Sequence, residues 1–131
     1  GLGAQVRFVG PAHLMPDAHE FAHIARCDSL KEGLGGADIV MGLRMQFERM
    51  GDGAAEAARG YYDRFGLTYE TLAFAKPGAH VMHPGPMNRG VEIDGALADD
   101  PERSLILRQV FYGVAVRMAC LDALITQGAQ Q

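Results

Sequence analysis

The chain has 131 residues, of which 48% are hydrophobic, so it can bury one core and is expected to form a single domain. The net charge of -4 argues against a nucleic-acid or anionic-membrane partner, and two cysteines far apart argue against a disulfide framework. No uninterrupted apolar run approaches the roughly 18 residues that a membrane-spanning helix requires, so we expect a soluble, cytoplasmic protein whose partners are small molecules or proteins.

The predicted elements alternate between strands and helices, which favours a mainly parallel α/β sheet. In chain order they are a strand over residues 5–10, a weaker strand over 21–26, a short helix over 30–37, a strand over 38–41, helices over 54–65 and 68–72, a strand over 79–82 and a long helix over 104–124. Asp28-Ser29 and Thr68 are predicted helix caps, and Gly66 a helix end. The chain enters its first strand without an initiating Met, so we expect a fragment of a longer protein.

A loop with two prolines, residues 83–90, follows the strand over 79–82, at the place where an α/β sheet ends and ligands usually lie. Proline fixes its own φ, donates no backbone hydrogen bond and pushes the preceding residue toward extended geometry. Carbonyls of this loop are therefore expected to point outward, toward a donor such as an amide NH2 group. His83 is a candidate hydrogen-bond donor or acid–base group. An ordinary strand-to-loop turn, with a histidine satisfied by the backbone, explains the same residues.

Arg44 and Gln46 follow the strand over 38–41 at a spacing that places both side chains on one side of an extended segment. A guanidinium offers two parallel donors that match carboxylate oxygens, and an amide adds a neutral donor. The pair is therefore a candidate site for a carboxylate ligand. The alternative is an exposed segment in which these residues form surface ion pairs with Glu48 and Arg49.

The remaining candidate groups have simpler explanations. His19 and His23 are four residues apart, but no Cys or carboxylate cluster completes a set of zinc ligands, so no metal is expected. Glycines over 33–36 precede a strand instead of following one, so they do not form a dinucleotide-binding fingerprint. Acidic residues over 99–102 lie before the long predicted helix, where they suit its dipole. Both cysteines are predicted to be small core residues.

Three segments in this order resemble aspartate carbamoyltransferases: residues 41–49, 81–93 and 109–119. The first contains Arg44-Met45-Gln46, and the second contains His83-Pro84-Gly85-Pro86. The resemblance covers only the carboxyl-terminal half of that family's catalytic chain. It implies that residues 1–131 are a single aspartate-binding domain, without the amino-terminal carbamoyl-phosphate domain. The implied fold is three-layer α/β, with a mainly parallel, Rossmann-like sheet flanked by helices.

The resemblance also implies a reaction, in which carbamoyl phosphate and L-aspartate give N-carbamoyl-L-aspartate and phosphate in pyrimidine biosynthesis. Arg44 and Gln46 match positions that bind the aspartate carboxylates, and Glu48 matches a position that orients such an arginine. The backbone carbonyls of residues 84–86 match those that receive the carbamoyl NH2 group and the attacking amine. His83 matches a scaffold position at the start of this loop.

Two alternatives to this reading are a transcarbamoylase for another amino acid and a non-catalytic scaffold or regulatory module with the same fold. Ornithine carbamoyltransferases are expected to show His-Cys-Leu-Pro at the loop, with a cysteine where this chain has Pro84. This difference, together with Arg44 and Gln46, favours a dicarboxylate substrate over a diamino acid.

Parts of the enzyme implied by the resemblance lie outside these residues. The phosphate-binding groups belong to the amino-terminal domain, so the isolated chain is predicted to be inactive. The helix over 104–124 is expected to pack on that domain, which leaves Val110, Val114 and Met118 exposed here. The complete chain is expected to form a homotrimer and to need no cofactor, with a dihydroorotase or a regulatory subunit as candidate partners.

Overall fold

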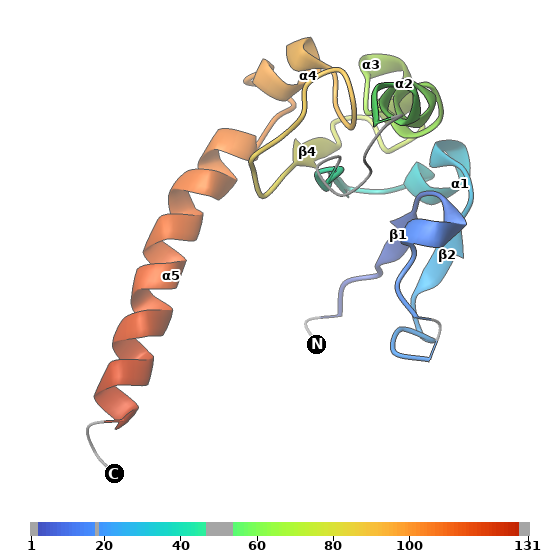
Figure 1. Ribbon diagram of the computed structural model, residues 1–131. Coiled ribbons are helices and arrows are strands. Elements are labelled where there is room, and N and C mark those ends of the chain that lie inside the picture. Colours follow the sequence, from blue (N-terminus) through green and yellow to red (C-terminus); the bar gives the residue numbers. More distant parts are fainter. Residues whose placement is uncertain (1–2, 18, 47–53, 129–131) are drawn as a thin grey trace.

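The computed structural model describes residues 3–17, 19–46 and 54–128, and its backbone alternates between strands and helices (Figure 1). In chain order the elements are β1 (Arg7–Val9), the 3-10 helix η1 (Ala12–Leu14), β2 (Ala25–Cys27), α1 (Leu30–Leu34), β3 (Ile39–Met41), α2 (Ala54–Phe65), α3 (Tyr69–Leu72), β4 (His80–Met82), α4 (Gly95–Asp99) and α5 (Ile106–Gly128). Each strand and helix predicted from the sequence has a counterpart, and several are shorter than predicted. The strand predicted over 21–26 is displaced, because β2 begins only at Ala25, and α5 continues past residue 124 to Gly128.

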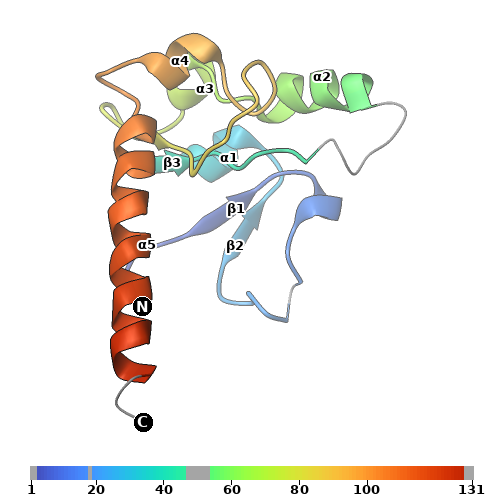
Figure 2. The same ribbon diagram turned by 60° about the vertical axis from the view of Figure 1, so that its left-hand side comes forward.

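The strands pair in parallel, as predicted. β1 pairs with β2 in a register that places Val9 opposite Cys27, and β3 pairs with β4 in a register that places Met41 opposite Met82. Within the described part of the chain, these ladders form two sheets of two strands each. Helices α3 and α4 lie on one side of β3, and β1 and β2 lie on the other (Figure 2). The fold is therefore of the α/β class that the alternating pattern indicates.

Hydroxyl side chains cap the N-termini of two helices at the predicted positions. Ser29 Oγ accepts a hydrogen bond from the Glu32 backbone N–H (3.3 Å) at the start of α1. Thr68 and Thr71 form a reciprocal capping box at α3, in which each hydroxyl accepts from the other residue's backbone N–H, at 3.2 and 2.9 Å. Such caps satisfy donors that the first helical turn leaves unpaired. The local sequence therefore fixes where these short helices start.

Two elements, η1 and α4, are not predicted from the sequence. Asp94 caps α4, because its carboxylate accepts hydrogen bonds from the backbone N–H groups of Ala96 (2.7 Å) and Leu97 (3.3 Å). Asp99, which is predicted to lie in a loop, is instead the last residue of α4 and forms a bidentate ion pair with Arg89. A helix of five residues is too short to show a helical period, so only its cap could have indicated it.

The hydrophobic core packs around β4. Its most completely buried aliphatic side chains come from β4, the segment before α4, α4 and the first turn of α5: Val81, Ile93, Leu97 and Ile106. The backbone ties these parts together, since the Leu105 N–H donates to the Val81 carbonyl (2.8 Å). Each such side chain contributes about 1.5–3 kcal/mol when fully buried. The core therefore fixes β4, whose carboxyl end leads directly into the proline loop.

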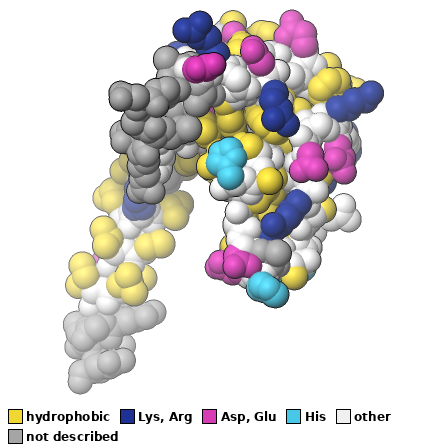
Figure 3. Space-filling view, turned by 45° about the vertical axis from the view of Figure 1, so that its right-hand side comes forward, with side chains coloured by type: hydrophobic (Ala, Val, Ile, Leu, Met, Phe, Trp, Pro, Cys, Tyr) yellow, Lys and Arg dark blue, Asp and Glu magenta, His cyan; other side chains and the backbone are white. Residues whose placement is uncertain are grey.

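Helix α5 extends away from this core, and hydrophobic side chains gather along it (Figures 1 and 3). Val110, Val114 and Met118 are 41%, 51% and 66% exposed, which confirms the exposure expected for this helix. Cys120 is also exposed on α5, so its assignment to the core is wrong, whereas Cys27 is buried as expected.

Helix α5 is long and apolar enough to span a membrane by length and composition alone, with a mean hydropathy of 1.3 between Ile106 and Thr126. The sequence expectation concerned uninterrupted apolar runs of roughly 18 residues, which this helix does not contain. Arg108, Arg117 and Asp122 interrupt the apolar stretch, but they leave its average apolar. A helix that is apolar on most sides needs apolar cover, which either protein or lipid can supply.

Candidate functional site

The two predicted ligand-binding segments leave the same edge of the β3–β4 pair. Arg44 and Gln46 follow β3, the proline loop follows β4, and parallel pairing places the carboxyl ends of both strands side by side. The Gly42 N–H donates to the Met82 carbonyl (2.9 Å), which extends the pairing past the strand ends. A β-carbon at Gly42 would lie 3.1 Å from the His83 ring, so the glycine allows this close approach.

Asn88 connects the two segments directly. Its side-chain Nδ2 donates to the backbone carbonyl of Met45 (2.9 Å), which lies between Arg44 and Gln46. The Arg44 side chain is half-buried and that of Gln46 is exposed. Glu48, which is predicted to orient Arg44, lies outside the described residues. The structure thus brings the two segments together, and the assignment of Arg44 and Gln46 to a carboxylate ligand stays a prediction.

Residues 84–86 of the proline loop have backbone acceptors but no free backbone donor. Pro84 and Pro86 carry no N–H, and the Gly85 N–H donates inward to Nδ1 of His83 (3.0 Å). Gly85 has a φ of 67°, a left-handed conformation that glycine adopts readily. Residues 84–86 therefore have no N–H left for an anion, and carbonyls are the backbone groups they can offer to a ligand.

His83 is completely buried at the start of this loop. Its backbone N–H donates to the side-chain Oε1 of Gln109 on α5 (2.8 Å), and its ring Nε2 lies 3.4 Å from Oε1 of Glu92. Burial lowers the pKa of His83, and the nearby Glu92 carboxylate opposes this effect. A neutral, enclosed imidazole suits a scaffold better than an acid–base group that reaches a ligand.

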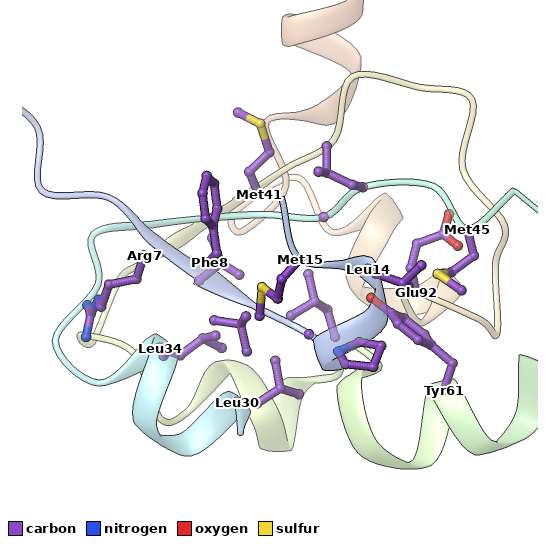
Figure 4. A pocket seen from close by; sticks show the side chains of 18 of the residues that line it. Arg7, Phe8, Leu14, Met15, Leu30, Leu34, Met41, Met45, Tyr61 and Glu92 are labelled. Carbon is purple, nitrogen blue, oxygen red and sulfur yellow. The ribbon is translucent and has the colours of Figure 1, made fainter. Parts of the chain in front are cut away.

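A cavity of about 780 Å³ lies beside the segment that carries Arg44 and Gln46 (Figure 4). Its lining comes largely from β1, η1, α1 and β3 and is mostly apolar. Glu92 lies next to Met45 at one end, and the Tyr61 ring reaches in from α2 (Figure 4). Burial and, to a smaller extent, the Glu92 charge raise the pKa of Tyr61. The volume is typical of small-molecule sites.

Three residues that hold the site together, Asn88, Glu92 and Gln109, have no local sequence signal that singles them out. In the sequence, they are marked only by their position inside the segments that carry the family resemblance. His19 and His23, for which no metal is expected, lie in turns and not on a helix. Within the described ranges, no group of three or more His, Cys, Asp or Glu side chains could hold a metal ion.

Comparison with protein families matches residues 1–124 to the description "Aspartate/ornithine carbamoyltransferase, Asp/Orn binding domain". The chain is 57% identical over 123 residues to the aspartate carbamoyltransferase catalytic subunit of Sphingopyxis alaskensis, which covers 94% of this chain and 36% of the relative. It is 54% identical over 126 residues to that of Granulibacter bethesdensis, covering 96% of this chain and 40% of the relative. The chain thus spans well under half the length of these relatives.

Solved structures support the same fold. Aspartate transcarbamoylase from Trypanosoma cruzi in complex with carbamoyl phosphate and aspartate superimposes with a TM-score of 0.66 at 30% identity, covering 88% of this chain and 38% of that one. Ornithine carbamoyltransferase from Campylobacter jejuni superimposes with a TM-score of 0.75 at 19% identity, covering 93% and 43%. Because this second identity is low, the match shows the fold alone. Both comparisons confirm the predicted three-layer α/β domain.

Proposed function

This chain belongs to the aspartate/ornithine carbamoyltransferase family, as its Asp/Orn-binding domain, and from that premise we propose that it supplies the L-aspartate-binding half of an aspartate carbamoyltransferase. One observation supports this most strongly: the parallel β3–β4 pair places Arg44 and Gln46 next to a loop whose backbone offers carbonyls. The first segment provides donors for carboxylates, and the second provides acceptors for amine and amide hydrogens. L-Aspartate and carbamoyl phosphate together carry both kinds of group.

In the proposed reaction, the α-amino nitrogen of L-aspartate attacks the carbamoyl carbon of carbamoyl phosphate. A carbon–nitrogen bond forms, the bond from that carbon to the phosphate oxygen breaks, and phosphate leaves with the electron pair while the nitrogen loses a proton. Arg44 and Gln46 hold the aspartate carboxylates. The carbonyls of residues 84–86 accept hydrogen bonds from the amine and from the carbamoyl NH2 group. This chain therefore contributes by orientation, which can supply a large part of the rate.

Aspartate is favoured over ornithine on charge and on loop composition. A guanidinium next to an amide attracts a second carboxylate, whereas it repels the side-chain ammonium of a diamino acid. Pro84 stands where ornithine enzymes are expected to have a cysteine. Since T. cruzi aspartate transcarbamoylase was crystallised with both carbamoyl phosphate and aspartate, substrates of this class fit the fold.

The exposed helix α5 is proposed to pack on an amino-terminal carbamoyl-phosphate domain. Its side chains Val110, Val114 and Met118 need apolar cover, and the family match to residue 124 includes nearly all of the helix. Protein cover of this kind explains the apolar composition without a membrane. We further propose a homotrimer in the cytoplasm, a role in pyrimidine biosynthesis, and no activity for these residues alone, because the phosphate-binding groups belong to the other domain.

The test is a chimeric catalytic chain in which these residues replace the matching segment of the S. alaskensis subunit. Carbamoyl-aspartate formation is measured for the chimera, for the unmodified relative and for the isolated chain, with L-ornithine as the control substrate. We expect the chimera to use aspartate only and the isolated chain to be inactive. A folded but inert chimera would support the scaffold alternative, and use of ornithine would contradict the assignment of Arg44 and Gln46.

A further inference from the structure

A buried network joins the proline loop to the segment after β3. Glu92, 2% exposed, is at its centre: its Oε1 accepts a hydrogen bond from the backbone N–H of Asn88 and lies 3.4 Å from Nε2 of His83. From Asn88 the network continues to the Met45 carbonyl (2.9 Å), and from His83 it continues to the Gly85 N–H (3.0 Å). Both predicted ligand-binding segments are therefore connected through one buried carboxylate.

The geometry also fixes the position of the proton on the imidazole. Nδ1 of His83 accepts from the Gly85 N–H, so it carries no proton, and a neutral ring must carry its proton on Nε2. Nε2 faces the Glu92 carboxylate, and an ionised carboxylate accepts hydrogen bonds but cannot donate one. Burial lowers the pKa of His83, which favours this neutral form. The loop is thus hydrogen-bonded to the imidazole, and the imidazole Nε2 contacts the Glu92 carboxylate at 3.4 Å.

We propose that Glu92 is a positioning residue which, through His83 and Asn88, holds the carbonyls of the proline loop at a fixed distance from Arg44 and Gln46. This inference rests on the proposed function of that site. The second carboxylate oxygen, Oε2, and Nε2 of His83 have no hydrogen-bond partner among the described residues. The hydrogen bond from the Asn88 N–H to Oε1 is therefore the main connection, and Nε2 of His83 contacts the same oxygen at 3.4 Å.

A fixed distance matters because aspartate must reach both segments at once. Its carboxylates are held on one side and its amine on the other, and a misplacement of about 1 Å can cost about 100-fold in rate. Removal of the Glu92 carboxylate would leave the half-buried Asn88 N–H without its acceptor and would take away the oxygen that faces Nε2 of His83, and unpaired donors of this kind are a state that folded proteins avoid. The loop or the Met45 segment would then shift to satisfy them.

The kinetic test uses the chimeric chain with Glu92→Leu and Glu92→Gln. Glu92→Gln keeps an acceptor oxygen, so we expect kcat/KM for aspartate within about threefold of the parent, whereas Glu92→Leu should lower it about tenfold or more. The KM for carbamoyl phosphate should not change. Lys76→Met is the matched control, because it removes only an exposed ion pair with Asp38 and should leave both constants unchanged. Equal kinetics in the parent and both Glu92 variants would overturn the proposal.

A second variant covers the case in which Glu92→Leu does not fold. Asn88→Ala removes the side-chain bond to the Met45 carbonyl and keeps the Glu92 carboxylate. We expect it to raise the KM for aspartate severalfold with little change in the KM for carbamoyl phosphate. An unchanged aspartate KM in this variant would show that the connection to the Met45 segment does not position the ligand, and would overturn the proposal.

The 15N NMR chemical shifts of the His83 ring report its tautomer and protonation state, and so test the network without an activity measurement. The His83→Gln variant is used to assign these signals. We expect the Nε2–H tautomer in the parent and in Glu92→Gln. A protonated ring or an Nδ1–H tautomer would overturn the inference. An inactive chimera without substitutions would contradict the proposed function, and not the positioning role of Glu92. The affinity of each variant for L-aspartate is then compared by calorimetric titration in place of kinetics.

Discussion

The substitution Gly42→Ala tests the close approach of the two segments. The new β-carbon would lie 3.1 Å from Cδ2 of His83 and 3.5 Å from Cδ1 of Leu67, whereas carbon atoms prefer about 3.5–4.0 Å. The His83 ring is completely buried and accepts a hydrogen bond at Nδ1 from the Gly85 N–H, and the His83 backbone N–H donates to Gln109, so the residue has little room to move. Overpacking of this kind costs about 1–3 kcal/mol. We expect a destabilisation in this range and a raised aspartate KM.

The measurement is urea unfolding and aspartate kinetics of the chimeric chain, with Gly10→Ala as a matched control. Gly10 also follows a strand, β1, but a β-carbon there meets nothing within 4 Å. The control should be neutral, or more stable by about 0.4–1 kcal/mol because alanine restricts the unfolded chain. Equal stability and equal aspartate KM in the two variants would show that Gly42 is not packed against the histidine as described.

Three further substitutions or conditions test other parts of the structure. Gly85→Ala places a side chain at a φ of 67° and should cost about 1 kcal/mol in urea unfolding, whereas no loss would mean that the loop adopts another conformation. Asp94→Ala removes the cap of α4 and should cost about 1 kcal/mol without changing the aspartate KM, while Asp94→Asn should retain most of the stability. Because burial lowers the pKa of His83, the unfolded chain binds its proton more readily, so stability should fall as pH drops below about 6.5. Replacement by Gln should reduce that pH dependence, and an identical dependence in both proteins would contradict a buried neutral histidine.

The sequence predicts well those features that one segment determines alone. Ser29 and Thr68 cap helices where expected, because a cap depends on residues three positions apart. The proline loop follows a buried strand as expected, since proline and glycine restrict the backbone locally. Helix α4 is missed because its five residues show no period. Cys120 is misassigned because an apolar helical face indicates burial without showing which surface covers it.

The parts of the site that join distant segments could not be predicted. Glu92, Asn88 and Met45 meet only after β3 and β4 have paired, and no spacing in the sequence records that meeting. A glutamate in a loop is usually exposed, so nothing local marks Glu92 as 2% exposed. The resemblance to carbamoyltransferases places these residues within matching segments. It identifies the ligand contacts better than the buried groups that support them.

The central claim is that Arg44 and Gln46 select L-aspartate for carbamoyl transfer. The most direct test compares the chimeric chain with its Arg44→Ala variant in a carbamoyl-aspartate assay, at varied L-aspartate and with L-ornithine as control. The variant should lose activity mainly through a raised aspartate KM, while ornithine is unused by either protein. An unchanged aspartate KM in a folded, active variant would contradict the claim.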